Sequence, residues 1–319
     1  MIKPKIIASR CLGFEKCRYN GETISSEIVE MLKKHAEFIT VCPEVEIGLG
    51  VPREPVRVAE SSGEKHLVQP ATDKNFTNEI NDWNKNFLLK FKDVDGFILK
   101  NRSPTCGIGD VKIYKGLSKT SSAYKGDGFF GGFVLEKFPF HPVEDEGRLL
   151  NYEIRDHFLV KLFCFTKFKE IKKQYSINAL NKFHSENKLL FMAYNQSGLR
   201  RLGKILASFD KSNKENIFNE YENEFLKIFS KKAGPGALIN VLLHAFGGMS
   251  ANLSADEKKF FLNSLEEYRD ERIPLSTVTY LIHSMAVRFK NNYLINQTLL
   301  DPYPQDLIKT SDSGRKLRR

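Results

Sequence analysis

The sequence predicts an α/β domain, with a mostly parallel sheet and helices on both of its faces, followed by an all-α helical domain. Over residues 1–145, short β-rich runs alternate with helical patterns. Over residues 146–319, the apolar residues recur with the helical period and no strand pattern competes with them. A chain of 319 residues is also long enough to bury two hydrophobic cores.

In the first domain, apolar runs predict strands at 4–9, 37–41 and 96–100, with amphipathic helices at 22–35 and 75–91 and a helix led by glycine at 126–139. The runs VRVAES and KHLVQP predict a short hairpin. Residues 141–151 are expected to form the linker to the second domain. There, helices are expected at 152–174, 176–195, 199–209, 217–232, 237–249, 255–273 and 274–289, with no internal repeat.

The net charge of +10 is distributed unevenly along the chain. Residues 1–145 carry 21 Lys and Arg against 20 Asp and Glu, whereas residues 146–319 carry 28 against 19. This excess favours a polyanionic partner for the helical domain, and a solvated basic surface with a flexible basic C-terminal tail explains it equally well. The longest apolar run, 237–246, is too short to span a bilayer, and the N-terminus lacks a signal-peptide pattern. We therefore expect a cytoplasmic protein with no membrane association.

The five cysteines are too few, and odd in number, for a secreted disulfide framework. Cys11, Cys42 and Cys106 each follow the carboxyl end of a predicted strand. In an open parallel sheet these ends converge on one crevice, so the three thiols are expected to meet there. They could bind a metal or a cluster and leave one coordination position open for a substrate. The alternative is that they are small, inert residues in tight turns.

Other residues near these cysteines are also candidates. Cys17 is close enough in sequence to Cys11 to be a fourth ligand or a spectator, whereas Cys164 lies in an apolar helix and is expected in the core. Glu44 follows the rigid Pro43 and could act as a general base, and Ser103 precedes a proline that would fix its turn. A surface glutamate and a turn-capping serine are the alternatives. The glycine clusters at 107–110 and 126–132 could bind a phosphate or form tight turns.

Three motifs in residues 1–145 resemble those of the thiouracil desulfidase family: SRCLGFEKCRYNG, VCPEVEIGLGVPRE and KNRSPTCG. In the second half, FHSENKLLFMAYN, LRRLGKILA and LINQTLLDPYPQDL resemble a helical domain of formerly unknown function that is often fused to that enzyme. Fusions of this type look like desulfidases that act on 4-thiouridine in transfer RNA. The two resemblances together span nearly the whole chain.

The resemblance implies a [4Fe-4S] cluster bound by Cys11, Cys42 and Cys106, with an open fourth iron that takes the thiocarbonyl sulfur of the substrate. Glu44 matches the family's catalytic carboxylate, which would activate water to attack C4 of the base. Ser103 matches the active-site serine, which would orient or protonate the ring. The reaction would replace sulfur by oxygen without net redox change. Cys17 departs from the pattern of many members, which leaves its contact with the cluster open.

A transfer RNA substrate would have to extrude the modified base, and most of its affinity would come from phosphate contacts. The candidate RNA-binding residues in the helical domain are Arg155, Lys161, His184, Lys188, Arg200, Arg201 and Lys204. For each residue singly, a solvated charge is the alternative, and for His184 an interior position. Two other functions remain open: desulfuration of free thiouracil or thiouridine nucleotides with a structural helical domain, and a non-enzymatic RNA-binding protein that holds a structural metal.

Overall fold

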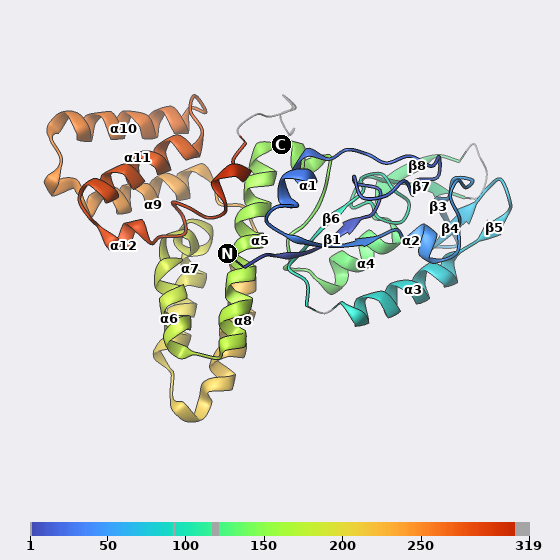
Figure 1. The fold of residues 1–319 in the computed structure, drawn as a ribbon, viewed down its shortest axis with the longest axis horizontal. Helices are drawn as coiled ribbons and strands as arrows, with labels where there is room; N and C mark the ends of the chain where they lie inside the picture. The colour runs from blue at the N-terminus through green and yellow to red at the C-terminus, as the bar shows by residue number, and fades with distance from the viewer. Residues whose placement is uncertain (1, 92, 117–120, 310–319) are drawn as a thin grey trace. The chain divides into compact units, whose positions relative to one another are not determined.

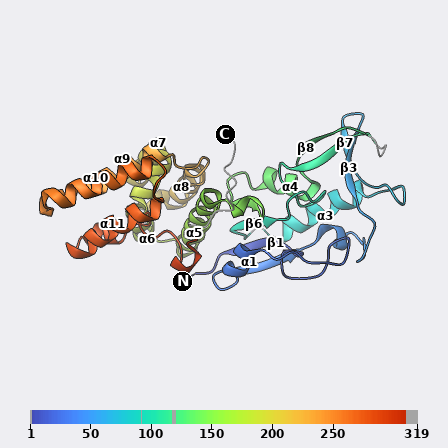
Figure 2. The same cartoon turned by 90° about the horizontal axis from the view of Figure 1, so that it is seen from above.

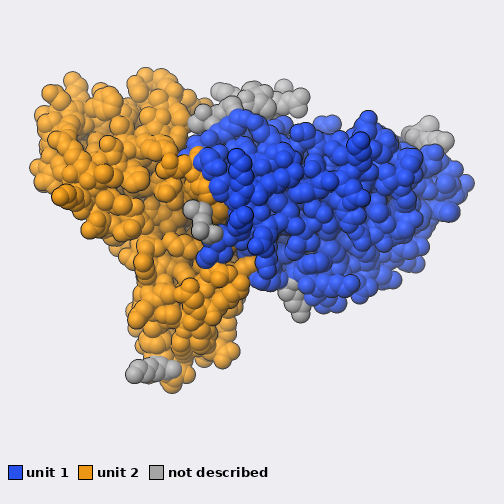
Figure 3. Space-filling model, in the orientation of Figure 1, with its two compact units in different colours: residues 1–162, 306–319 blue, residues 163–305 orange. Residues whose placement is uncertain are grey.

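The structure is a computed structural model that describes residues 2–91, 93–116 and 121–309 (Figure 1). The chain divides into two compact units, residues 1–162 with 306–319 and residues 163–305 (Figure 3). In the described part of the chain, no helix has both the length and the apolar character that crossing a membrane requires.

The first unit is built around a parallel sheet with the strand order β2-β1-β6-β9. Its described strands are β1 (Lys5–Ser9), β2 (Glu37–Val41), β6 (Gly96–Leu99) and β9 (Val143–Asp145). In β1, Ile7 lies opposite Ile39 of β2 and Phe97 of β6, with all strands running in the same direction. Because β1 and β6 are central, their residues are buried almost throughout. The predicted α/β fold is confirmed, and so are its three predicted strands.

A second, mixed sheet has the order β5-β4-β3-β7-β8. It contains β3 (Arg57–Ser61), β4 (Glu64–Gln69), β5 (Lys74–Asn75), β7 (Val111–Lys115) and β8 (Ala123–Gly126). The predicted hairpin is confirmed as β3 and β4, joined through Ser62 and Gly63, which both have positive φ. Such a pair suits a two-residue hairpin turn. The strands β7 and β8 were not predicted.

Helices cover both sides of the parallel sheet, with α1 on one side and α3 and α4 on the other (Figure 2). These are α1 (Glu27–Leu32), α2 (Pro43–Glu46), α3 (Thr77–Lys90) and α4 (Phe129–Lys137). The rings of Trp83 and Phe87 on α3 pack against Phe130 on α4. The predicted helix at 22–35 was too long, because Ser26 is extended and the N–H of Ile24 is bound to the carbonyl of Cys11.

The predicted linker at 141–151 was wrong in its first part. Residues Val143–Asp145 form β9, whose Val143, Glu144 and Asp145 pair with β6 in parallel. A short 3-10 helix, Arg148–Leu150, follows before α5 begins at Tyr152. The sheet therefore gains an edge strand from a segment too short and too acidic to carry a strand pattern.

The described elements after β9 are helical, which confirms the predicted all-α part. The α-helices are α5 (Tyr152–Gln174), α6 (Ile177–Glu186), α7 (Lys188–Ala207), α8 (Lys214–Ile228), α9 (Pro235–Gly247), α10 (Ala255–Arg269), α11 (Leu275–Arg288) and α12 (Asn292–Ile295). The further 3-10 helices are Lys211–Asn213, Ser250–Asn252 and Gln305–Leu307. Within the second unit, buried aromatic rings of Phe168, Phe183, Phe225 and Phe229 form a continuous cluster.

Candidate active site at the carboxyl edge of the parallel sheet

The chain order of the parallel sheet creates a crevice at one edge. From β1 the chain passes to β2 on one side, and it later enters β6 on the other side of β1. In open α/β sheets, ligands bind at such a switch point, beyond the carboxyl ends of the strands. Cys11, Cys42 and Cys106 follow β1, β2 and β6 respectively, so all three lie in loops that leave this edge.

The thiols of Cys11, Cys17 and Cys42 form a connected group. The Cys42 thiol approaches the carbonyl oxygen of Cys17 at 3.8 Å, and the thiols of Cys11 and Cys42 are near enough to that of Cys17 to shift its pKa. Cys17 is only 1% exposed. The residue that departs from the family pattern therefore contacts two of the three expected ligands.

Cys106 lies on the opposite side of β1 from Cys42 and is 5% exposed. Burial raises the pKa of its thiol to about 12, a hydrogen bond from Ser9 acts in the other direction, and charge on Cys42 and Glu44 raises it further. The pKa of Cys17 is raised to about 11, first by its hydrogen bond with Cys11. The pKa of Cys42 is also raised, first by its hydrogen bond with Cys17 and then by burial.

The three thiols on separate loops are soft donors, of the kind that bind iron–sulfur clusters and thiophilic metal ions. Among the residues that the structure describes, no three His, Cys, Asp or Glu side chains are arranged around one metal ion. A cluster binds its thiolates through different iron atoms and so accepts ligands that are farther apart. Thiols on separate loops at one sheet edge meet that requirement.

The Cys106 loop is shaped by Ser103. The Ser103 hydroxyl oxygen accepts hydrogen bonds from the backbone N–H groups of Thr105, at 3.3 Å, and Cys106, at 3.1 Å. The Ser103 carbonyl accepts from the N–H of Gly107 at 2.9 Å. The serine side chain therefore holds the turn that presents the cysteine.

The first turn of α4 holds the same loop. The N–H groups of Phe130 and Gly131 both bond to the carbonyl of Thr105, at 2.8 and 2.9 Å. A Cβ atom on Gly131 would lie 2.3 Å from the Gly107 carbonyl oxygen and 2.7 Å from that of Cys106. The glycine cluster at 126–132 therefore permits close packing of a helix against the Cys106 loop, and these two N–H groups are engaged within the protein.

Glu44 is placed beside the thiols by the short helix α2. Cys42 occupies the N-cap of this helix and Pro43 its first position, so Glu44 follows directly and is 8% exposed. Arg53 donates two hydrogen bonds to Oε2 of Glu44, from Nε at 2.9 Å and from Nη2 at 2.6 Å. Thr105 donates its hydroxyl hydrogen to Oε1 at 3.0 Å. A buried guanidinium and a hydroxyl therefore fix both carboxylate oxygens.

Arg53 and Thr105 are site residues that the sequence analysis did not assign. Through Nη1, Arg53 also donates to the carbonyl of Cys17 at 3.0 Å and to that of Gly50 at 3.1 Å. One guanidinium thus connects the Cys17 loop with Glu44. The signal was present, because Arg53 and Thr105 both fall within the three family motifs, but their contacts depend on tertiary structure.

Ser103, Thr105 and Glu44 form a chain of hydrogen bonds. The oxygens of the two hydroxyls lie 3.1 Å apart. Since the Thr105 hydrogen is directed to the carboxylate, the Ser103 hydroxyl donates to Thr105. Both predicted catalytic residues therefore belong to one polar network next to Cys106.

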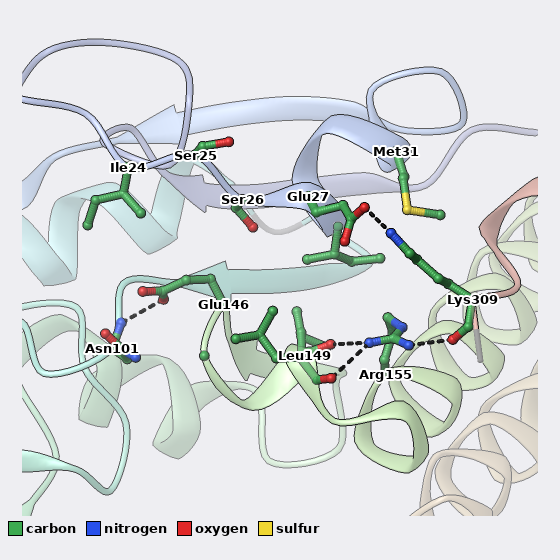
Figure 4. Close-up of a pocket in the computed structure, with 13 residues that line it drawn as sticks. Ile24, Ser25, Ser26, Glu27, Met31, Asn101, Glu146, Leu149, Arg155 and Lys309 are labelled. Carbon is green, nitrogen blue, oxygen red and sulfur yellow. Dashed lines mark hydrogen bonds and ion pairs between the residues drawn. The ribbon is translucent and has the colours of Figure 1, made fainter. Parts of the chain in front are cut away.

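A cavity of about 260 Å³ lies at the same sheet edge, within the first unit (Figure 4). Figure 4 shows Glu146 turned toward Asn101, whose N–H it accepts at 2.8 Å. Arg155 also lines the cavity, but it is 7% exposed and donates to the carbonyls of Leu149 and Leu150, at 2.8 and 3.2 Å. Its guanidinium holds together the backbone at the start of α5, and the contact of Arg155 with RNA stays a prediction.

Two further members of the predicted RNA-binding set lie inside the protein. Lys161 is 8% exposed and donates to the carbonyl of His141 at 3.2 Å, and burial lowers its pKa to about 8. His184 is half-buried, with Nδ1 at 3.1 Å from the Tyr221 hydroxyl, and burial lowers its pKa. Lys161 is therefore buried at a backbone carbonyl and His184 is half-buried beside Tyr221, and contact of either residue with RNA stays a prediction.

The other four members of that set are exposed on α7. Arg201 pairs with Glu224 at 2.7 Å. Lys188, Arg200 and Lys204 form no ion pair with any residue that the structure describes. Cys164 is buried in the second unit, as expected, and burial raises its pKa. The C-terminal tail at 313–319 lies outside the described residues.

Comparisons with known proteins cover both halves of the chain. Residues 6–146 match the family described as 2-thiouracil desulfurase, and residues 188–304 match a family described as a protein of unknown function (DUF1722). The uncharacterized protein YbgA of Escherichia coli (strain K12) is 25% identical over 161 residues, which cover 50% of this chain and 95% of that protein. The uncharacterized protein YbbK of Bacillus subtilis (strain 168) is 33% identical over 113 residues, covering 33% of this chain and 75% of that protein.

A solved structure, described as the [4Fe-4S]-dependent thiouracil desulfidase TudS, is 28% identical to the chain. The similarity covers 46% of this chain and 93% of that one, with a TM-score of 0.37.

Proposed function

The chain belongs to the thiouracil desulfidase family, fused to a helical domain, and from this premise we propose that it removes the sulfur of 4-thiouridine in transfer RNA. The observation that carries the proposal is the gathering of Cys11, Cys42 and Cys106, with Glu44, at the switch-point edge of the sheet. A thiobase that entered this crevice would meet thiol ligands and a carboxylate together.

The cofactor we propose is a [4Fe-4S] cluster held by Cys11, Cys42 and Cys106. When bound, such a cluster would supply a soft Lewis acid for the thiocarbonyl sulfur, with one position left without a protein ligand. The solved relative TudS is described as [4Fe-4S]-dependent, which supports the choice of cofactor. Cys17, which is 1% exposed, lies close to the thiols of Cys11 and Cys42.

Glu44 is the proposed general base toward water. Arg53, whose side chain is 6% exposed, pairs with the carboxylate at 2.6 Å and fixes its orientation. Arg53 occupies Oε2 with two hydrogen bonds, whereas Oε1 accepts a single hydrogen bond from the described residues, that of Thr105. We therefore assign Oε1 as the oxygen that accepts the proton of water.

Ser103 is the proposed proton donor to the ring. In the structure the hydroxyl hydrogens run from Ser103 through Thr105 to Oε1 of Glu44. Once Oε1 carries the proton of water, both hydroxyls must turn, so that Oε1 donates to Thr105, Thr105 donates to Ser103, and Ser103 gives its own hydrogen to the ring. Thr105 is a positioning residue in this scheme because it acts through Glu44 and Ser103. No electron transfer is needed, since the oxygen of water replaces the sulfur, which leaves at the sulfide oxidation level as hydrosulfide.

The choice of RNA as substrate rests on the helical unit. Lys188, Arg200 and Lys204 on α7 are exposed and form no ion pair with a described residue, so their charges are available for phosphates. The target base would be extruded from the RNA to reach the crevice. The match of the first domain to 2-thiouracil desulfurase favours a second candidate, desulfuration of a free thiobase.

The test is anaerobic incubation of reconstituted protein with transfer RNA that contains 4-thiouridine, following loss of the modified nucleoside. Glu44→Gln should keep its iron and lose turnover by roughly 100-fold or more, as expected for removal of a general base. The matched control is Glu46→Gln, at the exposed end of the same helix, which should turn over normally. An active Glu44→Gln variant would remove the base assignment, and turnover of free 4-thiouridine but not of RNA would favour the second candidate.

A further inference from the structure

The second unit contains a cavity that the proposed reaction does not use. Its volume is about 450 Å³, and its lining comes mainly from the end of α9 and from the segment that includes α12. The described lining residues are Leu189, Leu243, His244, Ala245, Gly247, Gly248, Asn291, Tyr293 and Leu294. All of them belong to the second unit, so the cavity is formed within that unit alone.

The walls combine an apolar floor with an aromatic ring and polar groups at the rim. Leu189 and Leu294 are buried, whereas the ring of Tyr293 is 44% exposed and His244 is exposed as well. The side-chain oxygen of Asn291 accepts from the N–H of Leu294 at 3.2 Å, which leaves the amide hydrogens of Asn291 to donate to a ligand. A flat ligand with a polar edge suits such a site.

Two lysines stand next in sequence to residues that line the cavity. Lys188 and Lys290 immediately precede the lining residues Leu189 and Asn291; both are exposed, and neither pairs with a described acidic residue. The described lining includes no Asp or Glu. Residues 163–305 carry 20 Lys and Arg against 14 Asp and Glu, a net charge of +6. The ligand is therefore expected to be anionic.

We propose that this cavity binds one unpaired nucleotide of the RNA substrate, with the base on Tyr293 and the flanking phosphates near Lys188 and Lys290. Single-stranded nucleotides bind to proteins by stacking on aromatic rings, with cations along the backbone. The site rests on the proposed RNA substrate and extends it, because it gives the helical unit a pocket for a base in addition to an exposed basic surface. It is separate from the crevice that receives the thiobase.

The first test adds a side chain at the cavity wall in one variant and removes the aromatic ring from it in another. A Cβ added to Gly247 would have no heavy atom within 4 Å, so Gly247→Leu introduces a side chain into open space at the cavity wall. Tyr293→Ala removes the stacking ring. Gly236→Leu, in the first turn of the same helix α9, is the matched control, since Gly236 also has open space and does not line the cavity. Binding of fluorescein-labelled transfer RNA is followed by anisotropy.

We expect Gly247→Leu and Tyr293→Ala each to weaken binding of transfer RNA roughly 5- to 100-fold, the range measured for loss of base stacking. Gly236→Leu should bind as the unsubstituted protein does. All three variants should desulfurate free 4-thiouridine at the unsubstituted rate, because the cavity is distinct from the thiol site. That second readout separates a binding defect from misfolding.

The second test concerns the cations. Lys188→Gln and Lys290→Gln should each reduce the slope of log affinity against log salt by about 0.7, the value for one phosphate contact on a single strand. Lys259→Gln, exposed on α10 and not adjacent in sequence to a lining residue, should leave the slope unchanged.

The inference is overturned if Gly247→Leu and Tyr293→Ala bind transfer RNA as tightly as Gly236→Leu does. If the unsubstituted protein shows no salt-sensitive binding of transfer RNA, the RNA substrate itself fails and the nucleotide site fails with it. If only the nucleotide site is wrong, Gly247→Leu and Tyr293→Ala still bind and desulfurate transfer RNA as the unsubstituted protein does. Failure of the site and failure of the RNA substrate therefore give different results.

Discussion

Replacing Gly131 by alanine should displace the Cys106 loop and reduce binding of the cluster. The added Cβ would lie 2.3 Å from the carbonyl oxygen of Gly107 and 2.7 Å from that of Cys106. Since even a close carbon–oxygen contact needs about 3.3 Å, the Gly107 carbonyl must move by about 1 Å. That movement shifts the adjacent thiol of Cys106 and disturbs the two N–H bonds that α4 gives to Thr105.

Alanine substitutions at two neighbouring glycines of the same segment should cause smaller displacements than Gly131→Ala does. A Cβ on Gly128 would lie 2.7 Å from the carbonyl oxygens of Pro104 and Thr105, so about 0.6 Å of movement is needed there. A Cβ on Gly132 would meet only the Cβ of Asp127, at 3.2 Å, which a few tenths of an ångström relieves. Loss of two N–H bonds in Gly131→Ala would cost about 1–3 kcal/mol, spread between folding and cluster binding.

The assay is iron per chain after anaerobic reconstitution and dialysis against a chelator, with the visible spectrum of the cluster as a second readout. Iron retention should fall in the order Gly132→Ala, Gly128→Ala, Gly131→Ala. Circular dichroism and thermal unfolding of the metal-free variants show whether each still folds. If folded Gly131→Ala retained as much iron as Gly132→Ala, the view that α4 sets the position of Cys106 would be refuted.

Two other predictions concern Thr105 and Asp145. Thr105→Val keeps the shape of the side chain but removes the hydroxyl between Ser103 and Glu44. Turnover should therefore fall roughly 10- to 100-fold at unchanged iron content, and Thr105→Ser should restore it. A valine variant with normal turnover would contradict the relay. Burial raises the pKa of Asp145 from its usual 3.8 to about 6. Below both pKa values the carboxyl is protonated in the folded and the unfolded protein, and its pKa shift has no effect on the free energy of unfolding. Above pH 6 the carboxyl is ionised in both states, and its burial lowers the free energy of unfolding. Asp145→Asn should therefore gain about 2–3 kcal/mol of unfolding free energy over the unsubstituted protein between pH 4 and pH 7, measured by urea unfolding, and parallel pH curves would contradict this.

The strands that position the site could be predicted because buried strands are runs of apolar residues, which are visible in the sequence. The runs at 4–9, 37–41 and 96–100 are apolar because they lie at the centre or next to the centre of a parallel sheet covered by helices. Once these strands are placed, the positions of the cysteines after their carboxyl ends follow from topology. The edge strand β9 (Val143–Asp145) has no apolar run, because two of its three side chains are acidic and it pairs with β6 through its backbone.

The charged residues of the site show the limit of this reasoning. Arg155 and Lys161 lie on α5, where a solvated cation is the ordinary expectation, yet both are buried and donate to backbone carbonyl groups. Arg53 is the reverse case, a cation in a loop that becomes buried against Glu44. The charge of each residue can be read from its type, but the partner that neutralises it is supplied by segments that are packed against it in three dimensions.

The contact between Arg53 and residue 17 explains why a departure from the motif can be accepted there. Arg53 donates to the backbone carbonyl of Cys17 rather than to its sulfur. Because each residue type has that carbonyl, the link between the Cys17 loop and Glu44 does not depend on which side chain stands at this position. The side chain points instead to the thiols of Cys11 and Cys42, in a place that is 1% exposed and suits any small apolar group. The general base is thus held by a contact independent of the side chain at position 17, and the thiol of Cys17 adds to the cysteine group without altering the position of Glu44.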